Sequence, residues 1–196
     1  MSRMASAAAL RQHRGDYGYD APLTGLLPPG ASGLLSAALA IYHTRRGRRL
    51  LAAIELASSL ALLLTFAIYL HTTRRGKFVV WADVLEELQL RGEEHALDMG
   101  CGRGAVMAML AKLLPRGRVT GLDLWRAEDQ SGNRPEVTES NLRAEGMLDR
   151  CELRTGDMLS MPLSDACFDL VVSSLAIHNI DERDLRHHER RLRWDY

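Results

Sequence analysis

The sequence predicts an α/β protein: a parallel sheet flanked by helices, preceded by one or two transmembrane helices. Three stretches support this prediction. Residues 95–114 fit a short buried strand, a glycine-rich turn and a helix with an apolar face. Residues 168–174 form a continuous apolar run, as expected for a parallel strand that is buried on both faces. Residues 50–70 form an apolar run long enough to cross a bilayer.

The composition places few limits on function. The 196 residues include 25 acidic and 25 basic side chains, so the net charge gives no reason to expect a nucleic-acid partner. The three cysteines, Cys101, Cys151 and Cys167, form no even framework, which fits reduced thiols in a cytosolic compartment. The length suits one ordinary domain, or a smaller domain with an appendage.

The chain divides into three regions. Residues 1–22 mix arginines with small and polar residues, so we expect a flexible N-terminal tail, and their apolar part is too short for a signal peptide. Residues 23–72 form the membrane region. Residues 78–196 form the α/β domain, which begins with an amphipathic helix from Phe78 to about Leu88.

The membrane region allows two topologies. Residues 50–70 have a single charge, Glu55, and basic residues flank them on both sides, which favours a transmembrane helix. Residues 31–42 are apolar but too short to span alone, and Pro28-Pro29 precede them. Either both segments form a membrane hairpin with the arginine-rich residues 43–49 at its tip, or only residues 50–70 span. We favour the hairpin, with the α/β domain on the cytoplasmic side.

The first strand of the α/β domain ends in a loop suited to an anionic ligand. Gly100, Gly102 and Gly104 alternate in this loop, and glycine allows positive φ angles and close approach of a ligand to the backbone. The helix that follows begins with free N–H groups and a positive dipole end. Asp98 precedes the glycines, where its carboxylate either fixes the loop or meets a cation. The loop also satisfies the weaker dinucleotide-binding pattern G-x-G-x-x-G/A.

The pattern D-x-G-x-G-x-G at residues 98–104 resembles the signature of class I S-adenosylmethionine-dependent methyltransferases with a methyltransferase type 11-like domain. Three later stretches resemble the same family in the same order. Residues 118–125 look like its second strand, residues 154–158 like its third strand and acidic turn, and residues 166–178 like its fourth strand and the substrate-side loop. The resemblance covers about residues 78–190 and implies a Rossmann-like fold.

The resemblance implies S-adenosyl-L-methionine as cofactor and a role for each matching residue. Asp98 is expected near the ammonium group, Asp123 at both ribose hydroxyls, and Asp157 beside the adenine. The full set of expected cofactor contacts is Asp98, Gly100, Cys101, Gly102, Gly104, Asp123, Leu124, Trp125, Asp157, Met158 and Ser174. Trp125 fits either the adenine or the plain core, and the polar loop 126–133 fits either a cap over the pocket or a solvated connection.

No residue is assigned as catalytic, because methyl transfer from a sulfonium needs no fixed base. His178 is a weak candidate for a general base, and a loop-holding role for it is favoured slightly. No metal site is predicted. The family sheet has seven strands, whereas this sequence predicts about four and ends before a fifth, which suggests a truncated product. The fourth strand would then be an exposed edge for a second copy or another partner to cover.

Three functions follow as hypotheses. The first is a membrane-anchored methyltransferase that acts on an unidentified small molecule or lipid. The second is a catalytically incomplete membrane protein whose half-domain serves as a binding or interaction module. The third and weakest is a dinucleotide-binding protein, which Asp98 and Asp157 disfavour.

Overall fold

The computed structural model describes residues 6–19, 27–127 and 129–177. The helices in chain order are α1 (Ala7–Leu10), α2 (Leu27–Arg45), α3 (Arg49–His71), the π-helical turn η2 (Thr72–Gly76), α4 (Lys77–Glu87), α5 (Ala105–Leu113), α6 (Pro135–Glu145) and the 3₁₀ turn η3 (Leu148–Arg150). The strands are β1 (His95–Met99), β2 (Arg118–Asp123), β3 (Cys151–Thr155) and β4 (Leu170–Val172).

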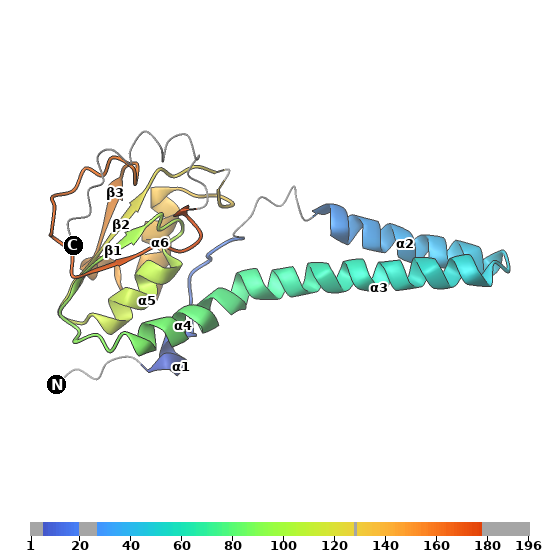
Figure 1. Cartoon of the computed structure of the whole chain (residues 1–196), viewed down its shortest axis with the longest axis horizontal. Helices are drawn as coiled ribbons and strands as arrows, with labels where there is room; N and C mark the ends of the chain where they lie inside the picture. Colours follow the sequence, from blue (N-terminus) through green and yellow to red (C-terminus); the bar gives the residue numbers. More distant parts are fainter. Residues whose placement is uncertain (1–5, 20–26, 128, 178–196) are drawn as a thin grey trace, which may run out of the picture.

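The four strands form one parallel sheet in the order β3-β2-β1-β4. This sheet and its flanking helices confirm the predicted Rossmann-like α/β fold (Figure 1). β1 lies at the centre, where Leu97 pairs with Thr120 on one side and Val171 on the other. The chain therefore winds toward β3 on one side of β1 and crosses to β4 on the other.

The fourth strand is shorter and more exposed than predicted. Only residues 170–172 pair with β1, and Val171 is 49% exposed, so this strand is not buried on both faces. The apolar pattern was misleading because β4 is an edge of the described sheet, where β1 is its strand partner. The prediction that a second copy or another partner covers this edge stays a prediction.

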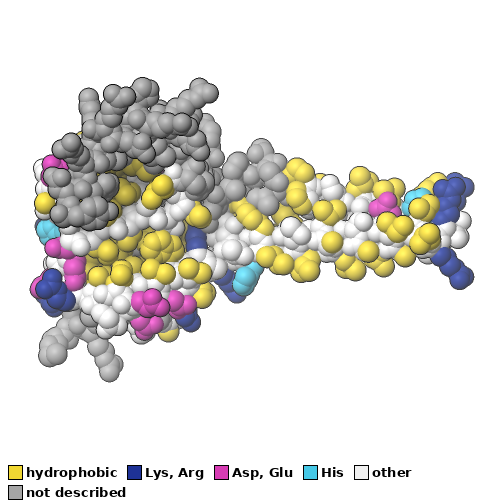
Figure 2. Space-filling model, in the orientation of Figure 1, with side chains coloured by type: hydrophobic (Ala, Val, Ile, Leu, Met, Phe, Trp, Pro, Cys, Tyr) yellow, Lys and Arg dark blue, Asp and Glu magenta, His cyan; other side chains and the backbone are white. Residues whose placement is uncertain are grey.

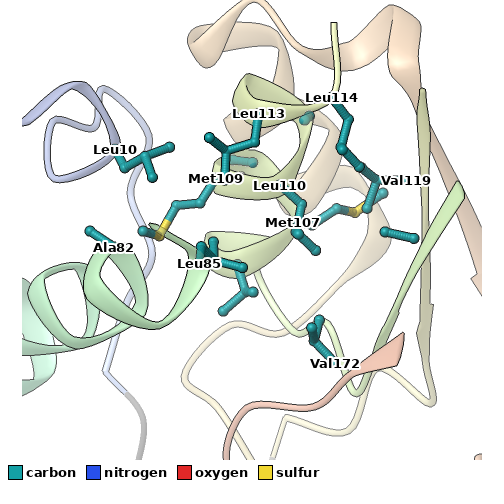
Figure 3. Packing of buried hydrophobic residues seen from close by; sticks show 14 of the residues in the cluster. Leu10, Ala82, Leu85, Met107, Met109, Leu110, Leu113, Leu114, Val119 and Val172 are labelled. Carbon is teal, nitrogen blue, oxygen red and sulfur yellow. The ribbon is translucent and has the colours of Figure 1, made fainter. Parts of the chain in front are cut away.

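The core lies between α5, the sheet and α4. Nearly every residue of α5 is buried, as its apolar sequence predicts. Met107 and Leu110 lie near Val119 and Leu114, while Met109 points toward Leu85 of α4 (Figure 3). Burial of this helix on all sides explains why no polar stripe is present in its sequence.

Residues 6–19 correct the prediction of a flexible tail over residues 1–22. Leu10 is 1% exposed and Tyr17 is 4% exposed, and both belong to the hydrophobic core. Leu10 points toward Met109 and the α4 residues Ala82 and Leu85 (Figure 3). The segment is packed because α4, α5 and α6 together offer it an apolar and hydrogen-bonding surface, which its own composition does not reveal.

Helices α2 and α3 form a hairpin that projects from the α/β domain (Figure 1). Helix α3 continues without a break through η2 into α4, so one helical rod connects the hairpin with the domain. Gly33 allows close packing, because a Cβ there would lie 2.9 Å from the Leu63 side chain. The buried Ser59 hydroxyl donates a hydrogen bond of 2.8 Å to the Gly33 carbonyl.

Apolar side chains are exposed along the face of the hairpin seen in Figure 2. Leu34, Leu50, Leu60 and Leu64 are each more than 60% exposed. Among the described residues, the rod Arg49–Glu87 is the one helix long and apolar enough to cross a membrane, and only 6% of its most apolar window is buried. The apolar window of this rod is therefore largely exposed, whereas its α4 end contributes Phe78, Ala82 and Leu85 to the core.

Candidate functional site

A cavity of about 390 Å³ lies at the carboxyl ends of the strands, where the chain reverses its winding direction around β1. Open α/β sheets bind ligands at this position, and the volume is within the usual range for small-molecule sites. Nine of the residues expected to contact the cofactor line the cavity: Asp98, Gly100, Cys101, Gly102, Asp123, Leu124, Asp157, Met158 and Ser174.

The glycine loop is held in place by the neighbouring strand. The N–H groups of Gly100 and Cys101 both donate to the carbonyl of Leu122, at 2.7 and 3.2 Å. Gly100 has a φ of +70°, and a Cβ at this position would lie 2.2 Å from the Cβ of Ala176. Gly102 has a φ of +50°, and a Cβ there would lie 2.4 Å from Oε1 of Gln130. Gly100 therefore requires glycine, whereas a side chain at Gly102 would be strained by the positive φ and would have to displace the Gln130 side chain.

Asp98 is a buried acid at the base of this loop. Its exposure is 1%, and neither carboxylate oxygen has a hydrogen-bond partner among the described residues. Burial raises the pKa of Asp98 from 3.8 to about 7; the nearby Met107 backbone N–H, which does not reach hydrogen-bond geometry, acts against this rise, and the charge of Asp123 adds to it. A buried acceptor without a donor is costly and therefore points to a missing cationic or hydrogen-bonding group.

Asp123 at the end of β2 is already engaged by the protein. Its Oδ2 accepts from the Gly102 N–H at 2.7 Å, while Oδ1 accepts from the Trp125 N–H at 2.6 Å and from Nδ2 of Asn133 at 3.0 Å. A carboxylate has about four acceptor positions, so about one is left. The expected bonds to both ribose hydroxyls thus require one of these donors, such as Asn133, to give up its position.

The turn after β3 also lines the cavity. The Gly156 N–H donates to the Asp123 carbonyl at 3.1 Å, which connects this turn to the end of β2. Asp157 caps its own turn by accepting from the Leu159 N–H at 2.9 Å. Leu124 lines the same part of the cavity and is 41% exposed, so an apolar surface is available there.

Two predicted contact residues lie outside the cavity lining. Gly104 is the N-cap of α5 with a φ of +79°, and a Cβ there would lie 2.8 Å from Thr138, so its role is in the packing of the loop. The indole of Trp125 donates to Oγ1 of Thr155 at 2.9 Å, at the end of β3. The backbone N–H of Trp125 donates to the Asp123 carboxylate, and the residue has a φ of +60°. This backbone conformation sets the direction of the indole ring. His178 lies outside the described residues.

The structure adds cavity residues that sequence reasoning missed. Lys77, Phe78 and Trp81 of α4 line the cavity, and the Trp81 indole donates to Oγ of Ser174 at 2.9 Å. The amphipathic pattern predicted the helix but gave no signal that it would lie over the winding reversal. Gln130 and Asn133 also line the cavity, which favours the cap over the solvated connection for the polar loop 126–133.

The chain is similar to known methyltransferases. A family model described as "Methyltransferase domain" matches residues 96–193, half of the chain. A demethylmenaquinone methyltransferase of Lactobacillus johnsonii is 27% identical over 100 residues, covering 50% of this chain and 38% of that protein. A sterol 4-C-methyltransferase of Caenorhabditis elegans is 29% identical over 101 residues, covering 52% and 28%. The chain thus spans less than two fifths of the length of these relatives.

Among solved structures, geranyl diphosphate C-methyltransferase of Streptomyces coelicolor A3(2) aligns with a TM-score of 0.47 at 21% identity, covering 63% of this chain and 43% of that one. The family match begins within β1 and includes the glycine loop, Asp123 and the turn at Asp157. The chain belongs to the class I S-adenosylmethionine-dependent methyltransferase family.

Proposed function

We propose that this chain binds S-adenosylmethionine in the cavity beside the glycine loop and transfers its methyl group to a membrane-soluble acceptor. The observation on which this rests is Asp98, a fully buried carboxyl with no hydrogen-bond partner among the described residues, at the base of a glycine loop in which Gly100 has no room for a side chain. An ammonium group would supply the donor that Asp98 lacks.

Each wall of the cavity suits one part of the cofactor. Asp98 and the glycine loop would hold the amino-acid portion, and Asp123 with Asn133 would hold the ribose. Leu124, Asp157 and Met158 would frame the adenine. The cofactor supplies an electrophilic sulfonium methyl group, so the protein's contribution is to position the acceptor and exclude water. Trp81 and Ser174, joined by their hydrogen bond, would form the acceptor side of the cavity.

The hairpin is proposed as the membrane anchor. Its helices have 23 and 19 residues, or roughly 35 and 28 Å at 1.5 Å per residue, against about 30 Å for a bilayer core. The exposed leucines favour a lipid environment over water. Because the segment before α2 and the helix after α3 both pack on the same domain, both ends of the hairpin would lie on one side of the bilayer, the cytoplasmic side.

The cavity lies close to the proposed bilayer surface, which favours a lipid acceptor. Lys77 lines the cavity six residues after His71, the last residue of α3, roughly 9 Å along the helix axis. The headgroup region on each side of a bilayer is about 5–8 Å thick. A lipid headgroup could therefore reach the α4 wall with its tail still in the membrane. Two relatives are named for the lipids demethylmenaquinone and sterol.

Calorimetric titration of the detergent-solubilised chain with S-adenosylmethionine tests the cofactor assignment, with Asp123→Ala as the matched variant. We expect saturable binding that the variant weakens at least tenfold. Absence of binding by a folded wild-type chain would refute the cofactor site. Transfer of labelled methyl into lipid extracts, lost in Asp98→Ala, tests the activity. Binding without any transfer would favour the alternative of a non-catalytic binding module.

The anchor is tested by labelling cysteines introduced at two matched glycines. Gly47 at the hairpin tip and Gly146 in the domain both have positive φ, and a Cβ at either position would meet no atom within 4 Å. In intact cells, and in a Cys167→Ser background, a membrane-impermeant maleimide should label Gly47→Cys directly. It should label Gly146→Cys only after permeabilisation. Equal labelling of both before permeabilisation would contradict a spanning hairpin.

A further inference from the structure

The segment before the hairpin, residues 11–19, lies along the domain as a strap between α4 and α6. Two side chains of α6 anchor it. Glu145 accepts hydrogen bonds from the N–H groups of Arg14 and Gly15 and from the Tyr17 hydroxyl. Asn141, which is 5% exposed, accepts from the Asp16 N–H and donates to the Asp16 carbonyl, both at 2.9 Å. The strap therefore has a defined position on the domain.

The far end of the strap contacts the loops that line the cavity. Asp16 pairs with the Arg103 guanidinium at 3.0 Å, and the other arm of Arg103 donates to the Ser131 carbonyl at 2.9 Å. Tyr19 and Ser131 are joined by two hydrogen bonds, from the Tyr19 N–H to Oγ of Ser131 and from the Ser131 N–H to the Tyr19 carbonyl. Gln130 donates to the Tyr17 carbonyl at 3.2 Å and accepts from the Arg103 N–H at 2.9 Å.

The strap also contacts α4, which forms another wall of the cavity. The ring of His13 stacks on Phe78 with centroids 4.0 Å apart, and Tyr17 meets Phe78 edge-on at 5.2 Å. Lys77 donates to the Tyr17 carbonyl at 3.4 Å. Arg103, Gln130, Lys77 and Phe78 all line the cavity. The strap thus connects two cavity walls that are otherwise more than 20 residues apart in sequence.

We propose that the strap is a positioning element of the cofactor site, in which Asp16 holds Arg103 and the loop 129–133 against the glycine loop. The proposal rests on the proposed function, since it concerns the same cavity. The strap and α4 both precede residues 96–193, so the positioning device lies outside the methyltransferase-domain match. Because the strap leads into α2 and α4 emerges from α3, both ends of the hairpin take part in the cofactor site.

A substitution at Asp16 distinguishes an effect on the cofactor site from an effect on folding. The Asp16 side chain is 83% exposed, whereas that of Arg103 is 12% exposed. An exposed partner adds little to stability, so an Asp16→Ala variant should fold. The guanidinium, however, loses one of its two acceptors and keeps the Ser131 carbonyl, and the Gly18 N–H loses its bond to the Asp16 carboxylate. The expected consequence is a change in cofactor affinity without a matching change in the unfolding temperature.

The experiment measures binding of S-adenosylhomocysteine by calorimetry to the full chain in detergent. We expect Asp16→Ala to weaken binding about fivefold, equivalent to about 1 kcal/mol. Asp83→Ala is the matched control, because it breaks the exposed ion pair with Arg11 at the other end of the strap, away from the cavity. This control should bind like the wild type, and Asp16→Glu should recover most of the affinity.

Hydrogen exchange supplies a second readout. In Asp16→Ala, amides of residues 129–133 should exchange faster, while those of β1 should be unchanged. Wild-type affinity and exchange in Asp16→Ala would overturn the positioning role and leave the proposed function intact. Equal losses in Asp16→Ala and Asp83→Ala would also overturn it, because they would indicate a general effect of loosening the strap. Failure of the wild type to bind would overturn both proposals.

Discussion

The buried carboxyl of Asp98 predicts that cofactor affinity rises with pH across neutrality. Its pKa is about 7 in the folded chain, chiefly because burial disfavours the charged form. Only the carboxylate can pair with the ammonium of S-adenosylmethionine or S-adenosylhomocysteine. At pH 6 about a tenth of the free protein is ionised at Asp98, and at pH 8 about nine tenths. The dissociation constant should therefore be about tenfold higher at pH 6 than at pH 8.

The same shift has a consequence of opposite sign for the ligand-free protein. The folded-state pKa lies above the unfolded value of 3.8, so the folded state holds the proton more tightly between these values. Stability from this group is fully present below about pH 4 and is lost as pH rises through 7. At 1.36 kcal/mol per pH unit, the loss is at most about 4 kcal/mol. Asp98→Asn should remove this loss and stabilise the ligand-free chain at pH 8.

Titration with S-adenosylhomocysteine at pH 6, 7 and 8 provides the assay, with urea unfolding of the ligand-free chain in the same buffers. Asp98→Asn should bind weakly and without pH dependence, while being more stable than the wild type at pH 8. A wild-type affinity that is flat from pH 6 to 8, or an asparagine variant that binds normally, would refute the assignment of Asp98 to the ammonium group. A variant less stable than the wild type at pH 8 would show that Asp98 has a structural partner.

Four further substitutions test the site and the packing. Gly100→Ala should abolish cofactor binding in the calorimetric titration, because the new Cβ would lie 2.2 Å from the Cβ of Ala176. Gly146→Ala is its control, because Gly146 has a similar φ and a Cβ there would meet no atom within 4 Å. This control should retain binding and lose about 1 kcal/mol of stability. Leu110→Ala, at a fully buried position, should lower the free energy of unfolding in urea by about 2–5 kcal/mol. Glu145→Gln should lower it by about 3 kcal/mol, because Lys112 would lose its buried partner at 2.9 Å; an unchanged midpoint would mean that this ion pair adds nothing.

Local sequence was sufficient for the central part of the fold. The acid and the alternating glycines at residues 98–104 specify a strand end, a loop with positive φ and a helix start, because each property depends on neighbouring residues alone. Asp123 and Asp157 were likewise predictable, since Asp123 ends β2 and Asp157 lies in the turn after β3. The second strand begins at residue 118 as predicted, for the same reason.

The positions of Trp81 and Trp125 relative to the cavity could not be inferred from neighbouring residues. Trp81 lines the cavity only because α4 packs across the sheet near Ser174, 93 residues later in the chain. The indole of Trp125 bonds to Thr155 and does not line the cavity. The reason is that the backbone N–H of Trp125 donates to the Asp123 carboxylate, which fixes the backbone in a positive-φ conformation.

The sequence by itself determined the parallel sheet, the glycine loop and the acids at the strand ends, since strand and loop preferences are local. Tertiary structure decided that residues 6–19 are part of the domain. Leu10 and Tyr17 are buried by surfaces of α4, α5 and α6, and the hydrogen bonds of Arg14 and Gly15 to Glu145 join residues about 130 positions apart. A segment of small, polar and basic residues gains its order only from the groove that receives it, because the burial that offsets its lost conformational entropy is supplied by residues far along the chain.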